Sequence, residues 1–262
     1  MKLDKERLLS FVTDIDTKKI IAKNLSRLES VINTKVPRYT DFLDPYQADV
    51  FTAVLNSFTD INYSICGGES AERRVILIYP YFYKKEELTD PMSFLRADRA
   101  GRADGISHRD VMGSLLSLGI KREKTGDIYV NEKFSDIAVD SSISDFIILS
   151  LKSIKTLKVD LHRIDETEVI YKEPEYIVKN VFVSTLRIDA LIAKAYNISR
   201  NDAKELVNGG LVKLDHKPVM SISQNFSENA LVSVKGRGRF KVGTDFRKTQ
   251  KGNIKLDISI YK

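Results

Sequence analysis

Nine basic side chains in residues 184–242 have the charge and the spacing needed to bind a phosphate backbone. They are Arg187, Arg200, Lys204, Lys213, Lys217, Lys235, Arg237, Arg239 and Lys241. Arg200 and Lys204 are four residues apart, so they would share one face of a helix. In residues 235–239 glycines alternate with the cations, and glycine lets a backbone approach a phosphate closely. These features predict nucleic-acid binding; a solvated basic face on a structural domain is the open alternative.

A second group of polar residues, His108-Arg109-Asp110, has the side chains that acid–base chemistry uses. The same triplet occurs in protein kinases, but the kinase glycine-rich loop, lysine strand and DFG motif are missing from this sequence. We expect instead that Asp110 stabilises a helix N-terminus and that Arg109 contacts RNA or a partner. His108 and Arg109, with Lys121 and Arg122 beyond that helix, are candidates for additional RNA or partner contacts.

A pair of glycines, Gly67-Gly68, follows an expected strand, where a turn can cradle a phosphate. Neither a Walker lysine–serine pair nor GxGxxG spacing accompanies the pair, which favours a plain turn. Cys66, His162 and His216 are isolated in sequence and predict no metal-ligand cluster. We therefore expect neither a metal nor a cofactor.

The apolar periodicity predicts an α+β chain. In the N-terminal part we expect helices over about 3–33 and 45–58 and strands at 62–65 and 75–79. The next part has the order strand, helix, strand, strand, helix, strand, which is typical of the ferredoxin-like plait shared with RNA-recognition motifs. Its strands are expected at 93–98, 127–130, 134–139 and 156–160, and its helices at 107–118 and 141–153. A single aromatic on the third strand, Phe134, gives little support for base stacking on this sheet.

The basic stretch should itself form two short helices followed by strands. Ser199 is a good N-cap for the second helix, and Asp202 stands at the third helical position, where it can reach back to the cap. Gly209-Gly210 should end that helix because glycine adopts the left-handed conformation without strain. Strands are expected at 176–183, 211–214, 230–235 and 253–261.

Charge is distributed unevenly along the chain. The net charge of the 262 residues is +6. Residues 181–262 hold 15 Lys and Arg against 7 Asp and Glu, a net charge of +8, and the other 180 residues hold 27 against 29, a net charge of −2. This asymmetry predicts one nucleic-acid-binding module on a near-neutral body.

These patterns together predict a multi-domain organisation. We expect an N-terminal helical α+β region at 1–80, the plait at 81–175, and the basic module with a C-terminal strand at 181–262. The single cysteine, the lack of a signal-peptide core and the lack of an apolar run near twenty residues predict a cytoplasmic protein. We expect it to act as a monomer.

The basic module resembles a known family. The segments that carry the resemblance are Leu186-Arg187-Ile188-Asp189, Ser199-Arg200 with Ala203, Gly210-Leu211-Val212-Lys213 and Val234-Lys235-Gly236-Arg237-Gly238-Arg239-Phe240. In this order they resemble the S4 RNA-binding domain. The chain departs from the family at Leu214-Asp215-His216-Lys217, where Val-Asn-Gly is common. The resemblance implies a domain that binds structured ribosomal or transfer RNA through its helix pair and the adjoining basic loop.

A wider resemblance covers essentially the whole chain. Residues 107–128, with Gly67-Gly68, Ala71-Glu72-Arg73 and the S4-like module, resemble the YlmH family of bacterial S4-domain proteins. The resemblance implies a non-enzymatic factor that binds ribosomal RNA of the large subunit, and peptidyl-tRNA, in ribosome-associated quality control. The family is also associated with cell division.

Two other functions stay open at this point. Many pseudouridine synthases carry S4 domains, and Ala100-Gly101-Arg102-Ala103-Asp104 resembles their GRLD motif except at its third position. Those enzymes place the S4 domain before a large catalytic domain, whereas only about twenty residues follow it here. A tyrosyl-tRNA synthetase would need HIGH-type and KMSKS-type motifs, which are not found upstream. The remaining alternative is an adaptor for the division machinery that docks through the N-terminal helices.

Overall fold

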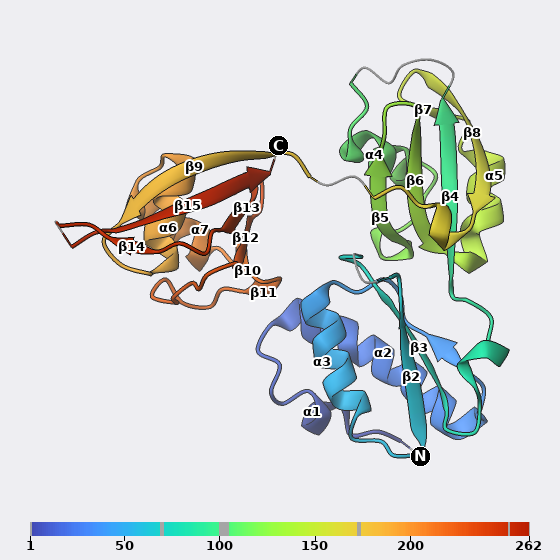
Figure 1. The fold of residues 1–262 in the computed structure, drawn as a ribbon. Helices are drawn as coiled ribbons and strands as arrows, with labels where there is room; N and C mark the ends of the chain where they lie inside the picture. Colours follow the sequence, from blue (N-terminus) through green and yellow to red (C-terminus); the bar gives the residue numbers. More distant parts are fainter. Residues whose placement is uncertain (1, 69–70, 100–104, 172–173, 251, 262) are drawn as a thin grey trace. The chain divides into compact units, whose positions relative to one another are not determined.

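The computed structural model describes residues 2–68, 71–99, 105–171, 174–250 and 252–261. The chain forms two compact units, Met1–Lys172 and Glu173–Lys262 (Figure 1). Both combine helices with antiparallel sheets, which confirms the predicted α+β, multi-domain fold. The two sheets of the first unit belong to one compact body, so 1–80 and 81–175 stay proposed subdivisions.

The first unit begins with helices packed on a small sheet. Its elements here are α1 (Lys5–Leu8), α2 (Ile15–Thr34), β1 (Arg38–Tyr39), α3 (Pro45–Leu55), β2 (Ile61–Cys66) and β3 (Val75–Pro80). The strands pair in the order β1-β3-β2, and α2 and α3 lie against them (Figure 1). Residues 3–33 are largely helical, as expected, but they form two helices, because Asp14 accepts a hydrogen bond from the Thr17 amide and starts α2. Asp44 and Gln47 form a capping box at the start of α3, with Pro45 at its first helical position.

The second part of this unit is the expected plait. Its elements are β4 (Met92–Arg99), α4 (His108–Ser117), β5 (Thr125–Val130), β6 (Phe134–Asp140), α5 (Ser144–Ser150), β7 (Ser153–Ile154) and β8 (Leu157–Ile164). The antiparallel order β5-β6-β4-β8 is that of the ferredoxin-like fold, so this prediction is confirmed. Leu95, Ile137 and Val139 face Val111 and Leu115 in the core beneath the helices. The second helix is shorter than expected because a 3₁₀ turn, Ser141–Ile143, precedes it.

The opposite face of the plait, which an RNA-recognition motif would expose, is filled by the chain itself. Phe42, Val75, Phe94, Ala138 and Val169 form a buried cluster there. This burial removes the surface on which bases would stack.

The lone aromatic of the third strand is also covered. The guanidinium of Arg96 lies 4.2 Å from the ring centroid of Phe134. Two short hydrogen bonds, 2.7 and 2.8 Å, hold the same guanidinium on the carboxylate of Asp136. The position of Arg96 agrees with the low expectation of base stacking on this strand.

A buried carboxylate joins the two parts of the first unit. Asp41, 6 % exposed, accepts ion pairs from Lys23 and Arg27 of α2, at 2.8 and 2.9 Å, and from Lys124, at 3.0 Å. Lys124 also contacts Asp140 of β6 at 2.6 Å. Burial alone would raise the pKa of Asp41, but the neighbouring cations lower it to about 2.

This carboxylate should give the first unit a measurable pH dependence. The pKa of Asp41 in the folded chain, about 2, lies below its ordinary value of 3.8. Its contribution to stability is therefore present above about pH 4 and is lost as the pH falls towards 2. We expect Asp41→Asn to lower the unfolding free energy by about 2 kcal/mol near neutral pH, and this deficit should shrink between pH 4 and pH 2.

Urea unfolding of both chains across this pH range checks the prediction. Asp60→Asn, which removes an exposed carboxylate from the same unit, is the control and should show no such convergence. A deficit for Asp41→Asn that is the same at pH 2.5 and pH 7 would contradict the assignment.

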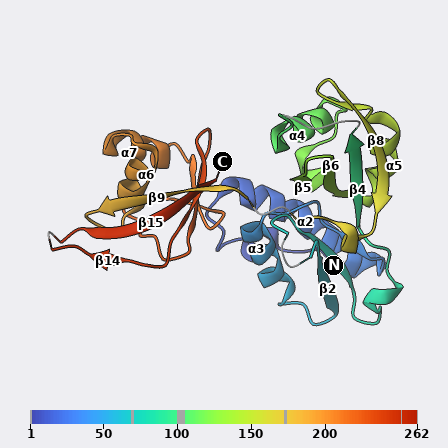
Figure 2. The ribbon, with the colours of Figure 1, turned by 45° about the horizontal axis from the view of Figure 1, so that its top comes forward.

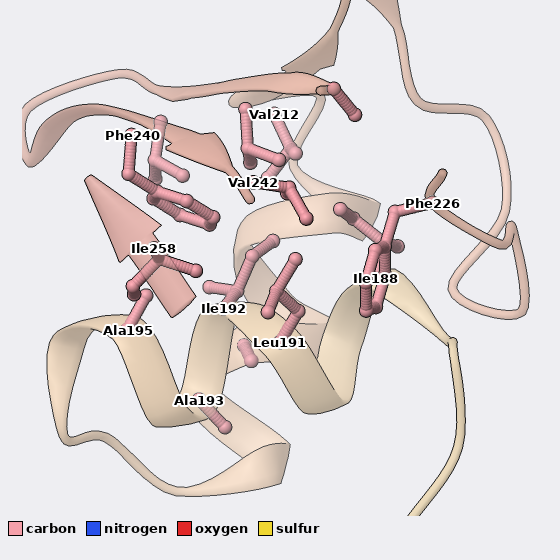
Figure 3. Packing of buried hydrophobic residues seen from close by; sticks show 14 of the residues in the cluster. Ile188, Leu191, Ile192, Ala193, Ala195, Val212, Phe226, Phe240, Val242 and Ile258 are labelled. Atoms are coloured by element: carbon pink, nitrogen blue, oxygen red, sulfur yellow. The ribbon is translucent and has the colours of Figure 1, made fainter. Parts of the chain in front are cut away.

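The second unit is one sheet with two helices on one face. Its elements are β9 (Tyr176–Val183), α6 (Ile188–Tyr196), α7 (Arg200–Asn208), β10 (Val212–Leu214), β11 (Lys217–Pro218), β12 (Leu231–Val234), β13 (Gly238–Val242), β14 (Arg247–Lys248) and β15 (Ile254–Tyr261). The strands follow the order β11-β10-β12-β13-β15, with β14 and β9 on opposite sides of β15. Side chains of β13 and β15 point at those of α6 in the core (Figure 3). Figure 2 shows α6 and α7 on the same side of this sheet.

Candidate nucleic-acid interface

The two helices of the second unit are fixed at their ends by side chains. Ser199 accepts a hydrogen bond from the Asp202 amide, and the Asp202 carboxylate accepts one from the Ser199 amide, so the predicted capping box is confirmed. Gly210, with φ of +67°, follows the end of α7 as expected. The ammonium of Lys179 on β9 donates to the carbonyls of Lys194 and Ala195 and to the Asn197 side chain at the end of α6. The helix pair is therefore a rigid support for its surface cations.

One buried carboxylate orients two of the predicted phosphate ligands. Asp189 is fully buried, and its oxygens accept hydrogen bonds from Arg187 at 3.0 and 3.2 Å and from Arg200 at 3.3 and 3.1 Å. Burial tends to raise the pKa of Asp189, but the two guanidinium groups lower it overall. Both arginine side chains stay partly exposed, 34 % and 48 %. They can therefore contact solvent-side phosphates from a fixed position.

Lys204 completes this helix surface. It lies one turn after Arg200 on α7 and is half-buried. Arg200 and Lys204 lie one turn apart on one helix, as their spacing predicted. The contact of Arg187 and Arg200 with Asp189 was not predicted from the sequence. One feature of the sequence could have indicated this role of Asp189: it is a charged residue inside an otherwise apolar helical stripe, two positions after Arg187.

The other six predicted cations lie elsewhere on the unit. Lys213, Arg239 and Lys241 alternate with the buried residues of β10 and β13, so they face away from the helices. Lys217 lies on the edge strand β11. The nine cations therefore divide between the helix side, the outer face of the sheet and its edges.

The glycine-rich segment 235–239 is a tight hairpin turn between β12 and β13. The Arg237 amide donates to the Val234 carbonyl, and Val234 pairs with Gly238. Gly236 and Gly238 have φ of +81° and +95°, which explains glycine at both positions. Lys235 and Arg237 are exposed on this turn.

The additional candidates around α4 do not form one cluster. His108 and Arg109 are exposed at its first turn, whereas Lys121 and Arg122 follow its last turn, and a ten-residue helix is about 15 Å long. Arg122 is an exposed residue, but its guanidinium donates to the carbonyls of Thr125 and Gly126. Burial of that group, with the nearby charge of Arg73, lowers the pKa of Arg122 to about 10. We interpret Arg122 as a structural residue and keep the other three as candidate contacts.

The polar groups that suggested an enzyme have structural partners. The Asp110 carboxylate caps α4 by accepting from Ser107 and lies 2.8 Å from the Lys155 ammonium, which agrees with its expected role at the helix start. Burial raises the pKa of the Cys66 thiol to about 11, which keeps it protonated. Within the described residues no three His, Cys, Asp or Glu side chains are placed to hold a metal ion. Residues 100–104, with the aspartate motif, lie outside the described part of the chain.

The Gly67-Gly68 turn borders a cavity of about 280 Å³. Both glycines have positive φ, +127° and +77°. Asp90, Glu166 and Lys85 line the cavity as well, and burial raises the pKa of Glu166. Two carboxyl groups against one ammonium group disfavour a phosphate at this turn, which supports the plain-turn interpretation.

Comparisons with known proteins agree with this architecture. The family model "Putative RNA-binding domain in YlmH" matches residues 97–168, which lie in the plait, and the S4 domain model matches residues 186–232, which contain the helix pair. The chain is 30% identical over 226 residues to "Ribosome-associated protein quality control protein P2" of Bacillus subtilis (strain 168). That alignment covers 86% of this chain and 88% of the relative. The chain belongs to the YlmH family. Both of its matching domain families are RNA-binding families.

The fold of this YlmH-family chain also resembles a solved structure. "Cell division protein ylmH from Streptococcus pneumoniae" matches with a TM-score of 0.53 and 23% identity, over 60% of this chain and 96% of that one. The likeness supports the fold. Among the described residues of the YlmH-family chain, no helix is long and apolar enough to cross a membrane.

Proposed function

We propose that this chain is a non-enzymatic factor that binds folded RNA of the large ribosomal subunit, together with tRNA, in ribosome-associated quality control. The observation that carries the proposal is the helix surface on which Asp189 fixes Arg187 and Arg200 beside Lys204. Fixed guanidinium groups suit phosphate oxygens because their planar donors match them in pairs. The surface lies inside the segment matched by the S4 model, and the relative's name supports the ribosomal setting.

The charge distribution supports RNA as the partner. The second unit contains the part of the chain with a net charge of +8, while the rest is near neutral. Phosphate contacts of this kind make affinity strongly dependent on salt. We further propose that the factor acts in the cytoplasm as a monomer, with His108, Arg109 and Lys121 as secondary contacts.

Salt-dependent co-sedimentation with purified large ribosomal subunits tests the proposal. Neutralising two phosphate ligands in Arg200→Ala/Lys204→Ala should lower affinity and should reduce the slope of log affinity against log salt by about 2 between about 50 and 200 mM salt. Lys18→Ala/Lys19→Ala, which removes the same charge from exposed positions of α2, is the matched control. We expect its slope to equal that of the unmodified chain. An unchanged slope for the first variant would contradict the site.

Two further measurements separate the finer claims. Subunits carrying a peptidyl-tRNA should bind more tightly than empty subunits if tRNA is contacted. Incubation with ribosomal and transfer RNA, followed by mapping of modified nucleotides, tests the enzymatic alternative. A modification that disappears in Asp104→Ala would overturn the non-enzymatic proposal.

A further inference from the structure

The outer face of the second unit's sheet carries an unusual set of side chains. Residues that alternate with the buried ones on β9 and β15 point away from α6 and α7. Val181 and Val183 of β9 are buried in the core, so Tyr176, Val178 and Phe182 belong to the outer face. These three side chains are 41 %, 63 % and 49 % exposed. Three large apolar side chains exposed on one face of one strand indicate a binding surface.

Two of the aromatic rings on this face are already arranged as a platform. Tyr176 lies opposite Tyr261 in the β9–β15 register, and their ring centroids are 4.9 Å apart, edge to face. The Arg239 guanidinium from β13 lies 4.5 Å from the Tyr261 ring centroid. A row of a planar cation and two rings therefore runs across three strands.

Basic residues accompany the aromatic ones along the face. Lys241 lies opposite Ser259, one outward position from Tyr261, and Lys255 lies opposite Phe182 at the other end of β15. Lys255 and Tyr261 are six positions apart on β15, which is about 20 Å along a strand. The outward residue Asp257 is the acidic member of this part of the face.

We propose that this face binds the unpaired bases of a single-stranded RNA segment. The exposed rings of Tyr176 and Phe182 and the Arg239 guanidinium that covers Tyr261 offer planar surfaces for stacking. With the lysines of the same face they match the platforms that hold unpaired bases while cations neutralise the backbone. A protein partner fits less well, because interface centres are depleted of lysine whereas lysines interrupt the apolar residues here. The site is distinct from the helix surface, and β9, β13 and β15 lie outside residues 186–232 matched by the S4 model.

Binding of two RNA probes by the full chain tests this site. The probes are a fluorescent ten-nucleotide oligouridylate and a fully paired RNA hairpin, each followed by anisotropy at fixed salt. Tyr176→Ala/Tyr261→Ala should weaken oligouridylate binding by between about fivefold and a hundredfold for each stacked base lost. Its effect on hairpin binding should stay below about twofold. Tyr176→Phe/Tyr261→Phe keeps both rings and should restore oligouridylate binding.

The helix-surface variant Arg200→Ala/Lys204→Ala should show the reverse pattern, with hairpin binding weakened more than oligouridylate binding. This comparison distinguishes a wrong assignment of the outer face from a wrong proposed function, because the two variants test different surfaces. Phe182→Ala, at an exposed position remote from the tyrosine pair, is a second probe of the face that spares the core. Lys241→Ala should lower the salt slope for oligouridylate by about 0.7.

Three outcomes would overturn the proposal. The first is oligouridylate binding that neither the tyrosine variant nor Phe182→Ala changes. The second is an equal loss of affinity for both probes in the tyrosine variant, which would show that the rings support folding or the helix surface rather than base stacking. The third is a protein whose capture depends on these rings while RNA binding does not.

Discussion

Gly126→Ala should lower the unfolding free energy of the first unit by about 1–3 kcal/mol, although it adds a single methyl group. Gly126 lies on β5, and a Cβ built there would lie 2.5 Å from Cε1 of Phe42 and 2.9 Å from Cβ of Ala138. Phe42 is 2 % exposed and belongs to the cluster that covers the face of the plait opposite its helices. The ring has little room to move, so the added methyl should displace it or the strand.

A matched substitution on a nearby element makes this prediction specific. Gly113 of α4 has no heavy atom within 4 Å of its would-be Cβ, so Gly113→Ala should stabilise the same unit by about 0.5–1 kcal/mol. Thermal and urea unfolding of both variants would show opposite signs. Combining Gly126→Ala with Phe42→Leu should cost less than the sum of the two single changes, because the smaller side chain leaves space. Equal effects of the two glycine substitutions would contradict the packing described here.

Phe240→Ala should cost the second unit about 3–5 kcal/mol. Phe240 is fully buried on β13, beneath α6, and its ring centroid lies 5.7 Å from that of Tyr196 (Figure 3). Its removal would leave a cavity that a small sheet with two helices cannot close. Domains of this size are stabilised by only about 5–15 kcal/mol, so we expect much of that margin to disappear.

The loss should be confined to one of the two units. Calorimetry of the full chain should show the transition of the second unit moving to lower temperature while that of the first stays in place. Phe240→Leu, which keeps most of the volume, should cost less than about 1.5 kcal/mol. A parallel shift of both transitions would show that the two units unfold together.

Local patterns in the sequence were sufficient to predict most elements of this fold. The periodicity of apolar residues and the capping residue Ser199 placed helices and strands where they occur, because these signals act over three or four positions. The order of elements in the plait then restricted its topology. The break between α1 and α2 was missed because the apolar stripe continues through Leu9 and Val12, which are buried although they are not helical.

Contacts between distant residues were not predictable in the same way. The sequence does not show that Asp189 would hold Arg200, eleven positions away. Strand register decided that Lys213 and Arg239 face away from the helices, and register depends on the whole sheet. The glycines of 235–239 were interpreted as a phosphate-binding loop, while their positive φ angles serve a hairpin.

The position of β15 has a consequence for how the chain is made. This last strand lies between β13 and β9, and among the described strands β9 pairs with β15 alone. During translation, β9 can pair only after residues 254–261 have been made, because its partners lie 71 to 85 positions later in the chain. Until then the nascent domain presents open strand edges, which favour aggregation. A messenger truncated just before these codons would yield a product with unpaired strand edges that is prone to aggregate. We expect such a product to be degraded by proteases rather than to refold slowly.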